Sequence, residues 1–209
     1  MSNITSRSFF TLFASLLVVL LASCSNWDKF YDGQASKDIA IDQDTFGCIS
    51  DMTRVNQMYV DNLLGDLDGT IAAAKEGGTF PVGSALRLIP DEIMVKGKSG
   101  SHPSTGDWMF VRLDYDKDKE TQEVTKGYED ITNFLNLTCF SCHVVAVQHD
   151  FVCGDKEGNK NCNPIPFDRP MLHALQNTDP RCESQKDVSQ EDAEALARLQ
   201  KVVKELLAK

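Results

Sequence analysis

The spacing of apolar residues predicts two helices in the first half of the chain. Met52, Val55 and Met58 recur at helical intervals within residues 51–63, so this stretch is predicted to be an N-terminal helix. A second helical stretch covers residues 68–75 and ends at a pair of glycines, which are common just past helix ends.

The pattern then changes to short apolar or alternating runs, which predict strands. Pro90 and a loop rich in glycine and serine separate these runs, and the charged segment 114–119 predicts a turn. The predicted strands cover residues 85–89, 92–96 and 108–113.

Helical periodicity returns in the second half of the chain. Residues 128–137 are predicted to form a helix that leads into a cysteine motif, and a short helix is expected near Met171–Gln176. Ser189 caps a strongly periodic helix over residues 190–207. The predicted fold class is α+β, an antiparallel β-sheet domain with an N-terminal helix, a helix at the cysteine motif and a C-terminal helix.

The N-terminus has the layout of an export signal. Arg7 precedes an apolar run over residues 9–22, which is shorter than the roughly 20 residues that span a bilayer. The run ends in Leu21-Ala22-Ser23-Cys24, which resembles the lipobox of bacterial lipoproteins. The resemblance implies that Cys24 is acylated and becomes the mature N-terminus, and Ser25 favours the periplasmic face of the outer membrane. An ordinary signal peptide and an uncleaved anchor are the alternatives.

Cys139-Phe140-Ser141-Cys142-His143 is a Cys-x-x-Cys-His motif, the attachment sequence of c-type haem. Two thiols three residues apart on one helical turn can form thioethers with the two vinyl groups of one haem, and the adjacent histidine can ligate the iron. Cys139, Cys142 and His143 are therefore predicted to hold one covalent haem c, with His143 as the proximal ligand. Covalent haem attachment takes place outside the cytoplasm, in agreement with the export signal.

Other interpretations of the motif stay open. A redox-active Cys-x-x-Cys would follow a strand in a thioredoxin-like βαβ pattern, and no such pattern surrounds it. A zinc site could recruit Cys153 and Cys162, and a disulfide could close within the motif. The motif could also be fortuitous in a surface lipoprotein without haem.

Four further cysteines form an even set in an exported chain, which predicts two disulfides with three possible pairings. Cys153 and Cys162 flank a polar loop that could close into a hairpin. The favoured pairing is Cys153–Cys162 with Cys48–Cys182.

The sixth iron position decides between ligand binding and electron transfer, since a methionine or histidine there would give a six-coordinate electron carrier. Simple packing is favoured for Met171, and a surface role for His149. The candidate sixth ligands are Met94, Met109, Met171, His102, His149 and His173.

Several motifs occur in a characteristic order. The turn Phe80-Pro81-Val82-Gly83-Ser84 precedes a strand, Gly106-Asp107-Trp108 opens another, and the late haem motif is followed by Asp150-Phe151-Val152. Over residues 50–153 the chain thereby resembles the cytochrome P-460 and cytochrome c′-beta family. The resemblance implies a mainly antiparallel β domain and a five-coordinate haem that binds nitric oxide or a similar small ligand.

In the oxidising branch of that family, a strand lysine is cross-linked to the haem. The resemblance places Leu88 near that position, with the nearest lysines on the next strand or its loop, which favours the c′-beta branch with its apolar distal lid. The resemblance implies a lid of Phe80, Leu88, Trp108 and Phe110, and ordinary β core is the alternative for each.

The chain is therefore predicted to be an exported, lipid-anchored mono-haem cytochrome that binds a small diatomic ligand. The alternatives are an electron carrier with a redox partner protein, and a hydroxylamine or nitric oxide oxidoreductase with a proton-transfer group such as Asp107 or His102. A net charge of −10 argues against nucleic acid as a partner. The C-terminal helix packs on the domain or forms a homodimer contact. The predicted segments are a signal peptide at 1–23, a tether at 24–47, the haem domain at 48–185 and the C-terminal helix at 186–209.

Overall fold

The computed structural model describes residues 39–153, 165–183 and 188–208. The predicted signal peptide, Cys24 and Cys162 lie outside these residues.

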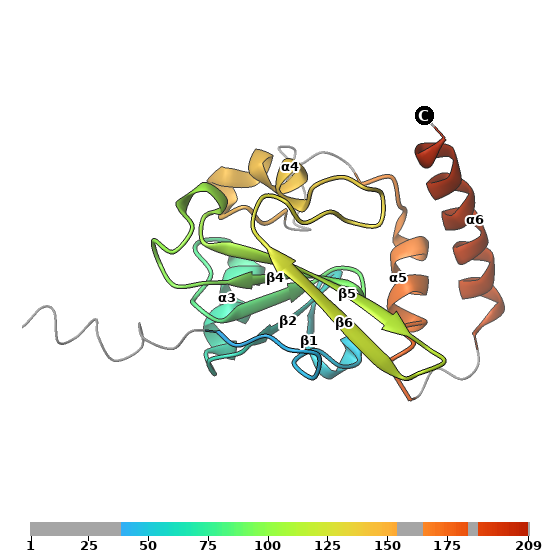
Figure 1. The fold of residues 1–209 in the computed structure, drawn as a ribbon, viewed down its shortest axis with the longest axis horizontal. Helices are drawn as coiled ribbons and strands as arrows, with labels where there is room; N and C mark the ends of the chain where they lie inside the picture. Colours follow the sequence, from blue (N-terminus) through green and yellow to red (C-terminus); the bar gives the residue numbers. More distant parts are fainter. Residues whose placement is uncertain (1–38, 154–164, 184–187, 209) are drawn as a thin grey trace, which may run out of the picture. The chain divides into compact units, whose positions relative to one another are not determined.

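Six strands pair antiparallel in chain order, so that each strand lies beside the strand that precedes it in the sequence (Figure 1). With the helices, this sheet confirms the predicted α+β class. The strands are β1 (Thr53–Val55), β2 (Met58–Asn62), β3 (Ser84–Arg87), β4 (Glu92–Lys96), β5 (Trp108–Asp116) and β6 (Thr121–Gly127). The helices are α3 (Leu67–Glu76), α4 (Cys139–His143), α5 (Arg169–Asn177) and α6 (Gln190–Leu207).

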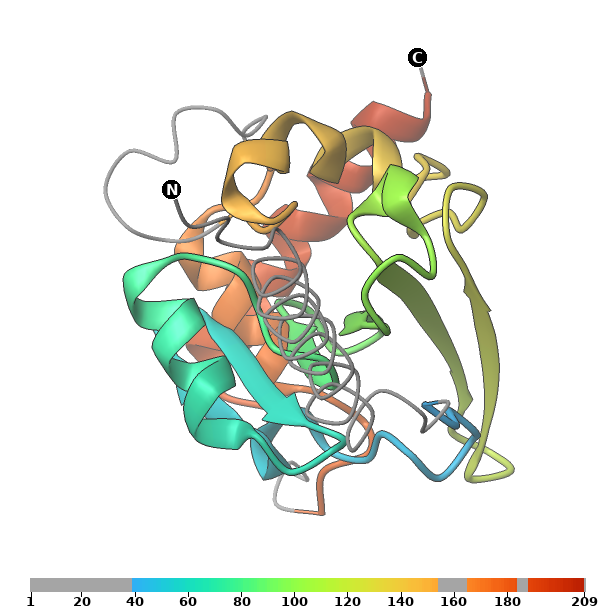
Figure 2. The same ribbon diagram turned by 90° about the vertical axis from the view of Figure 1, so that its left-hand side faces the viewer.

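Three of the helices begin at a polar capping residue, and their positions confirm the predictions. The side chains of Asp66, Asp168 and Ser189 accept hydrogen bonds from backbone N–H groups in the first turns of α3, α5 and α6. Helix α6 packs against α5, and the two lie side by side in Figures 1 and 2. Packing within the fold, rather than a dimer contact, therefore accounts for its buried stripe.

The prediction of a helix over residues 51–63 is wrong, because this segment forms the β1–β2 hairpin. Burial alternates along β2, with Met58 and Val60 buried and Tyr59 between them only partly buried. Asn56 supplies the turn with a φ of 56°, a left-handed conformation that asparagine tolerates better than most residues. The apolar spacing is compatible with both structures, and strand pairing decides between them.

The predicted helix over residues 128–137 is also wrong. Thr132 and Thr138 form an isolated antiparallel bridge that closes a loop before the cysteine motif. The Asn133 carboxamide accepts hydrogen bonds from the N–H groups of Leu135 and Leu137, and Asn136 has a φ of 59°. These local hydrogen bonds replace the helical ones.

Alternate residues of the sheet face two separate hydrophobic cores. The first core includes the cross-strand row Val60, Leu86, Met94 and Phe110, and residues of α3 and α4 pack against it. The second core includes Ala85, Ile93, Val95 and Val111 on the other face.

The N-terminal segment covers the second core, which corrects the predicted tether at 24–47. Ile41 and Phe46 are each 5% exposed and belong to this core. Residues 39–47 are therefore part of the domain, because their apolar side chains close one face of the sheet.

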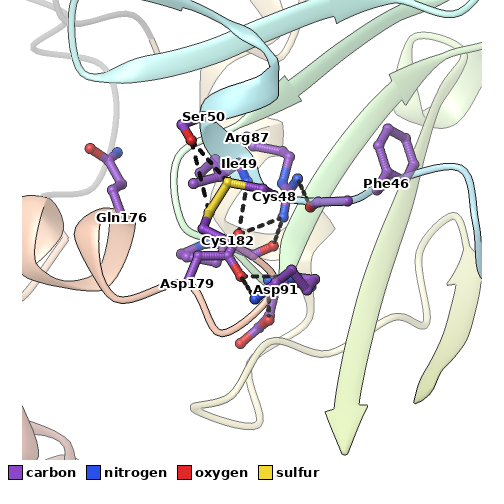
Figure 3. Close-up of polar contacts among 12 residues, drawn as sticks. Phe46, Cys48, Ile49, Ser50, Arg87, Asp91, Gln176, Asp179 and Cys182 are labelled. Atoms are coloured by element: carbon purple, nitrogen blue, oxygen red, sulfur yellow. Dashed lines mark hydrogen bonds and ion pairs between the residues drawn. A yellow bond between two sulfur atoms is a disulfide. The ribbon is translucent and has the colours of Figure 1, made fainter. Parts of the chain in front are cut away.

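A buried charged cluster joins the N-terminal segment to the chain after α5 (Figure 3). Arg87 on β3 lies 3.7 Å from Asp179, and the two side chains are 1% and 0% exposed. The Asp179 carboxylate also accepts hydrogen bonds from the Ile49 N–H and from the Arg181 side chain, at 2.8 and 2.7 Å. Burial lowers the pKa of Arg87 to about 10, which leaves it a cation at neutral pH.

The Cys48–Cys182 disulfide lies beside this cluster and confirms the predicted pairing (Figure 3). Among the described residues, Cys48, Asp179 and Cys182 also form a group with the side chains to bind a metal, but the disulfide removes both thiolates. Cys153 is disulfide-bonded as well, while its predicted partner Cys162 lies outside the described residues. The Cys153–Cys162 pairing therefore stays a prediction.

Substitution of Asp179 by asparagine should destabilise the fold by about 3–5 kcal/mol, because it leaves the buried Arg87 cation without its carboxylate. Lys119→Ala is the matched control, since it breaks the exposed Lys119–Asp116 pair, which contributes at most about 1 kcal/mol. Urea unfolding of both variants measures the difference. Equal losses in the two variants would contradict the assignment.

Candidate functional site

The Cys-x-x-Cys-His motif forms helix α4, directly after the loop closed by the Thr132–Thr138 bridge. The Cys139 N–H donates to the Ile131 carbonyl at 2.8 Å, and Ile131 is buried in the first core. Cys139 and Phe140 pack against the same core. This anchoring places both thiols and the imidazole on one short helix at the sheet surface.

Cys139 and Cys142 are free thiols, so no disulfide closes within the motif. Burial, and next to it the charge of Glu92, raises the pKa of Cys139 to about 12. Redox-active motifs instead contain a thiol of lowered pKa, and the sheet here is antiparallel throughout the described strands. The disulfide at Cys153 removes one thiolate from the alternative zinc site. These observations disfavour, in turn, a disulfide within the motif, a redox-active motif and a zinc site.

The His143 ring is held by the backbone just after the motif. Its Nδ1 lies 2.8 Å from the Phe151 carbonyl oxygen. Because a carbonyl can only accept, Nδ1 carries the proton and Nε2 keeps its lone pair. Burial lowers the pKa of His143, which favours the neutral imidazole that a metal requires.

Three of the four predicted lid residues are buried in the first core. The rings of Phe110 and His143 have centroids 5.4 Å apart, and Trp108 donates from its indole nitrogen to the Asp150 carbonyl at 2.7 Å. Phe80 packs edge-on against Trp108 at 5.5 Å. All three are at most 3% exposed. They are therefore β-core residues, as the alternative interpretation predicted, and a role of any of them over a haem stays a prediction.

Leu88, the fourth predicted lid residue, is not part of the first core. The residue that β3 contributes to this core is Leu86. The Leu88 carbonyl accepts a hydrogen bond from Gln176 of α5. Several exposed apolar residues instead flank the motif in the sequence. Large apolar side chains that are 38–51% exposed near it are Phe134, Leu137, Val144, Val145 and Val147.

A cleft of about 830 Å³ lies between the sheet and α6, and Cys139, Cys142 and His143 are not among the residues that line it. Glu92 and Arg112 line it, and both lie close enough to Cys139 to influence its pKa. The loop at 133–136 and the C-terminal half of α6 form other walls. This volume lies within the usual range of cofactor sites. Exposed apolar residues on either side of two free thiols in the sequence fit a macrocycle with an apolar body and a polar edge.

The candidate sixth ligands are dispersed over the fold. Met94 lies in the first core, against which Cys139 packs, and Met109 contributes to the second core on the other face. Met171 is buried on α5, as the packing interpretation predicted. His173 is hydrogen-bonded to Arg54, His149 is exposed and His102 stacks on Tyr128.

The two candidate proton-transfer groups have local structural roles. The Asp107 carboxylate accepts hydrogen bonds from the N–H groups of Gly100 and His102, at 2.8 and 2.7 Å. These contacts fold the loop before β5. Neither Asp107 nor His102 lines the cleft between the sheet and α6.

Comparisons of the chain with protein-family models, with curated proteins and with solved structures find no match. The resemblance to the cytochrome P-460 and c′-beta family therefore stays a prediction. Within the described part of the chain, no helix combines the length and the apolar character needed to cross a membrane.

Glu92 should make folding less favourable as the pH rises. Burial raises the pKa of its carboxyl from an ordinary 4.5 to about 7. The unfolded chain therefore ionises before the folded one, and stability falls between about pH 4.5 and pH 7, by at most about 3 kcal/mol. Glu92→Gln should unfold like the parent protein at pH 4.5 and be more stable at pH 8.

The measurement is urea unfolding of the protein with free Cys139 and Cys142 thiols. Glu205→Gln, at an exposed position of α6, is the control and should show no comparable trend. An effect of Glu92→Gln that is equal at both pH values would refute the raised pKa.

Proposed function

We propose that this protein is an exported, lipid-anchored c-type cytochrome with one haem, which binds nitric oxide or a related small diatomic ligand. Cys139 and Cys142 would form the two thioether bonds, and Nε2 of His143 would ligate the iron. Bound there, the haem supplies an iron centre for reversible ligand binding and one-electron chemistry.

The hydrogen bond from His143 to the Phe151 carbonyl is the observation that supports this proposal best. Histidine ligands of metals commonly donate their second ring N–H to a carbonyl or carboxylate, which fixes the tautomer and the ring orientation. His143 has this arrangement, directly beside two free thiols on the same helical turn. A buried histidine with a purely structural role would not require the two thiols.

The dispersed positions of the candidate sixth ligands support an open iron position, and thereby a diatomic ligand. Met109 contributes to the second core, and Met171 and His173 lie on α5, whereas Met94 lies in the first core, against which Cys139 packs. A five-coordinate iron with an open sixth position is the state that binds small neutral ligands.

Removal of the two thiols should abolish covalent haem attachment. The chain is expressed with a c-type maturation system, and haem retained after denaturing electrophoresis is measured for the parent protein and Cys139→Ala/Cys142→Ala. Ser141→Ala, which changes the exposed residue between the thiols, should keep full attachment. Covalent haem in the double variant would disprove the proposed attachment.

Spectra of the same preparations test the ligand. The ferrous protein should be high-spin and should shift on addition of carbon monoxide or nitric oxide. A low-spin spectrum with a sulfur-to-iron band would instead identify an electron carrier with a methionine ligand.

The lipid anchor is tested separately. Cys24→Ser should move the protein from the membrane fraction to the soluble periplasmic fraction, because loss of the acyl chains removes about 0.8 kcal/mol of membrane affinity per methylene. Ser23→Ala is the control, since it keeps the acylated thiol. Membrane retention of the serine variant would contradict acylation at this residue.

A further inference from the structure

Two consecutive residues after the motif, Asp150 and Phe151, have left-handed backbone conformations. Their φ angles are 53° and 62°, and neither is a glycine. Such conformations are unfavourable for residues with a β-carbon and persist when surrounding contacts impose them. Phe151 is also the residue whose carbonyl holds His143.

The contacts that impose this turn converge on Asp150 from three separate parts of the chain. One carboxylate oxygen lies 2.5 Å from Nζ of Lys96, and the other accepts from the Phe80 N–H at 2.8 Å. The Asp150 carbonyl accepts from the Trp108 indole at 2.7 Å. Both carboxylate oxygens and the carbonyl oxygen of Asp150 are therefore bound by residues of β4, of β5 and of the segment before β3.

Lys96 is the centre of this arrangement. Its side chain is 8% exposed, so its charge has little access to water. Besides Asp150 it donates to the Gly106 carbonyl at 2.7 Å and lies 5.0 Å from the Trp108 ring centroid. A buried ammonium must keep such partners, because the loss of one partner leaves an uncompensated charge.

Phe151 is held both by its backbone N–H and by its ring. Its N–H donates to the Ala146 carbonyl at 2.9 Å, and its ring lies against Gly106. A β-carbon at Gly106 would approach the Phe151 ring to 2.5 Å, a distance that forces the ring to move. Gly106 itself has a φ of 61° and accepts from Lys96. The direction of the Phe151 carbonyl thus depends on Lys96 both through Asp150 and through Gly106.

We propose that Lys96 and Asp150 are positioning residues for the iron ligand: their ion pair fixes the 150–151 turn, so that the Phe151 carbonyl holds His143 as the Nδ1–H tautomer. This inference rests on the proposed haem attachment. The hydrogen bond makes the imidazole a more basic ligand, which strengthens the bond to iron and stabilises the ferric state.

Lys96→Met and Asp150→Asn test the ion pair, and Gly106→Ala tests the Phe151 position without a change of charge. Lys98→Met, at an exposed position two residues further along, is the matched control. The first measurement uses the haem-free protein and nitrogen-15 NMR of the His143 ring. The parent protein and the control should show protonated Nδ1 alone, whereas the three variants should show a mixture of tautomers.

The second measurement uses the haem-loaded protein. Relative to the control, the variants should have a higher midpoint potential and, where the ferrous haem is five-coordinate, a lower iron–histidine stretching frequency in resonance Raman spectra. Circular dichroism identifies any variant that fails to fold. The test is then made on the variants that do fold.

The outcomes separate the two proposals. A parent protein that shows the Nδ1–H tautomer but attaches no haem would overturn the proposed function and leave the positioning of His143 intact. Folded variants with the parent tautomer, potential and stretching frequency would overturn the positioning role, even with haem fully attached.

Discussion

Two buried cations on neighbouring strands determine where the second half of the chain docks. Arg87 on β3 faces one side of the sheet and Lys96 on β4 faces the other, as their cross-strand partners Ile93 and Trp108 indicate. Neither charge can remain inside the protein without a carboxylate. Asp179 provides it for Arg87 and Asp150 for Lys96, each from a segment far along the chain.

The two ion pairs have different structural roles on the two faces of the sheet. On the Arg87 side, Asp179 and the Cys48–Cys182 disulfide hold the N-terminal segment and the end of α5 together. On the Lys96 side, Asp150 brings the backbone after α4 against Trp108 and Phe80, and this fixes the His143 ring. Stability and the candidate cofactor site therefore depend on the same physical requirement, applied to opposite faces.

The sequence predicted those elements whose signals are local. Helix α6 follows from its periodic stripe and its Ser189 cap, and β4 follows from an apolar run bounded by Pro90 and glycine. The motif itself identified Cys139, Cys142 and His143. Strand β6 gave little signal, since no residue in it is fully buried.

The features that the sequence did not predict depend on tertiary contacts. The spacing of Met52, Val55 and Met58 suits a helix, and only pairing with β3 selects the hairpin. Trp108 and Phe110 were candidates for a distal lid or for ordinary β core, and only the tertiary packing shows that they are buried in the core. Lys96 and Asp150 are separated by 54 residues, and nothing in the sequence near either one indicates its partner.

The consecutive strand order bears on the order in which the protein matures. Each strand pairs with its neighbour in sequence, so the sheet needs only short loop closures, which form quickly. The Lys96–Asp150 contact and the Cys48–Cys182 disulfide, which spans 134 residues, close later. By this order, the sheet would form before the turn at Asp150 docks α4 against it. For the proposed haem attachment, this order would give an assembly enzyme access to both thiols until Asp150 docks.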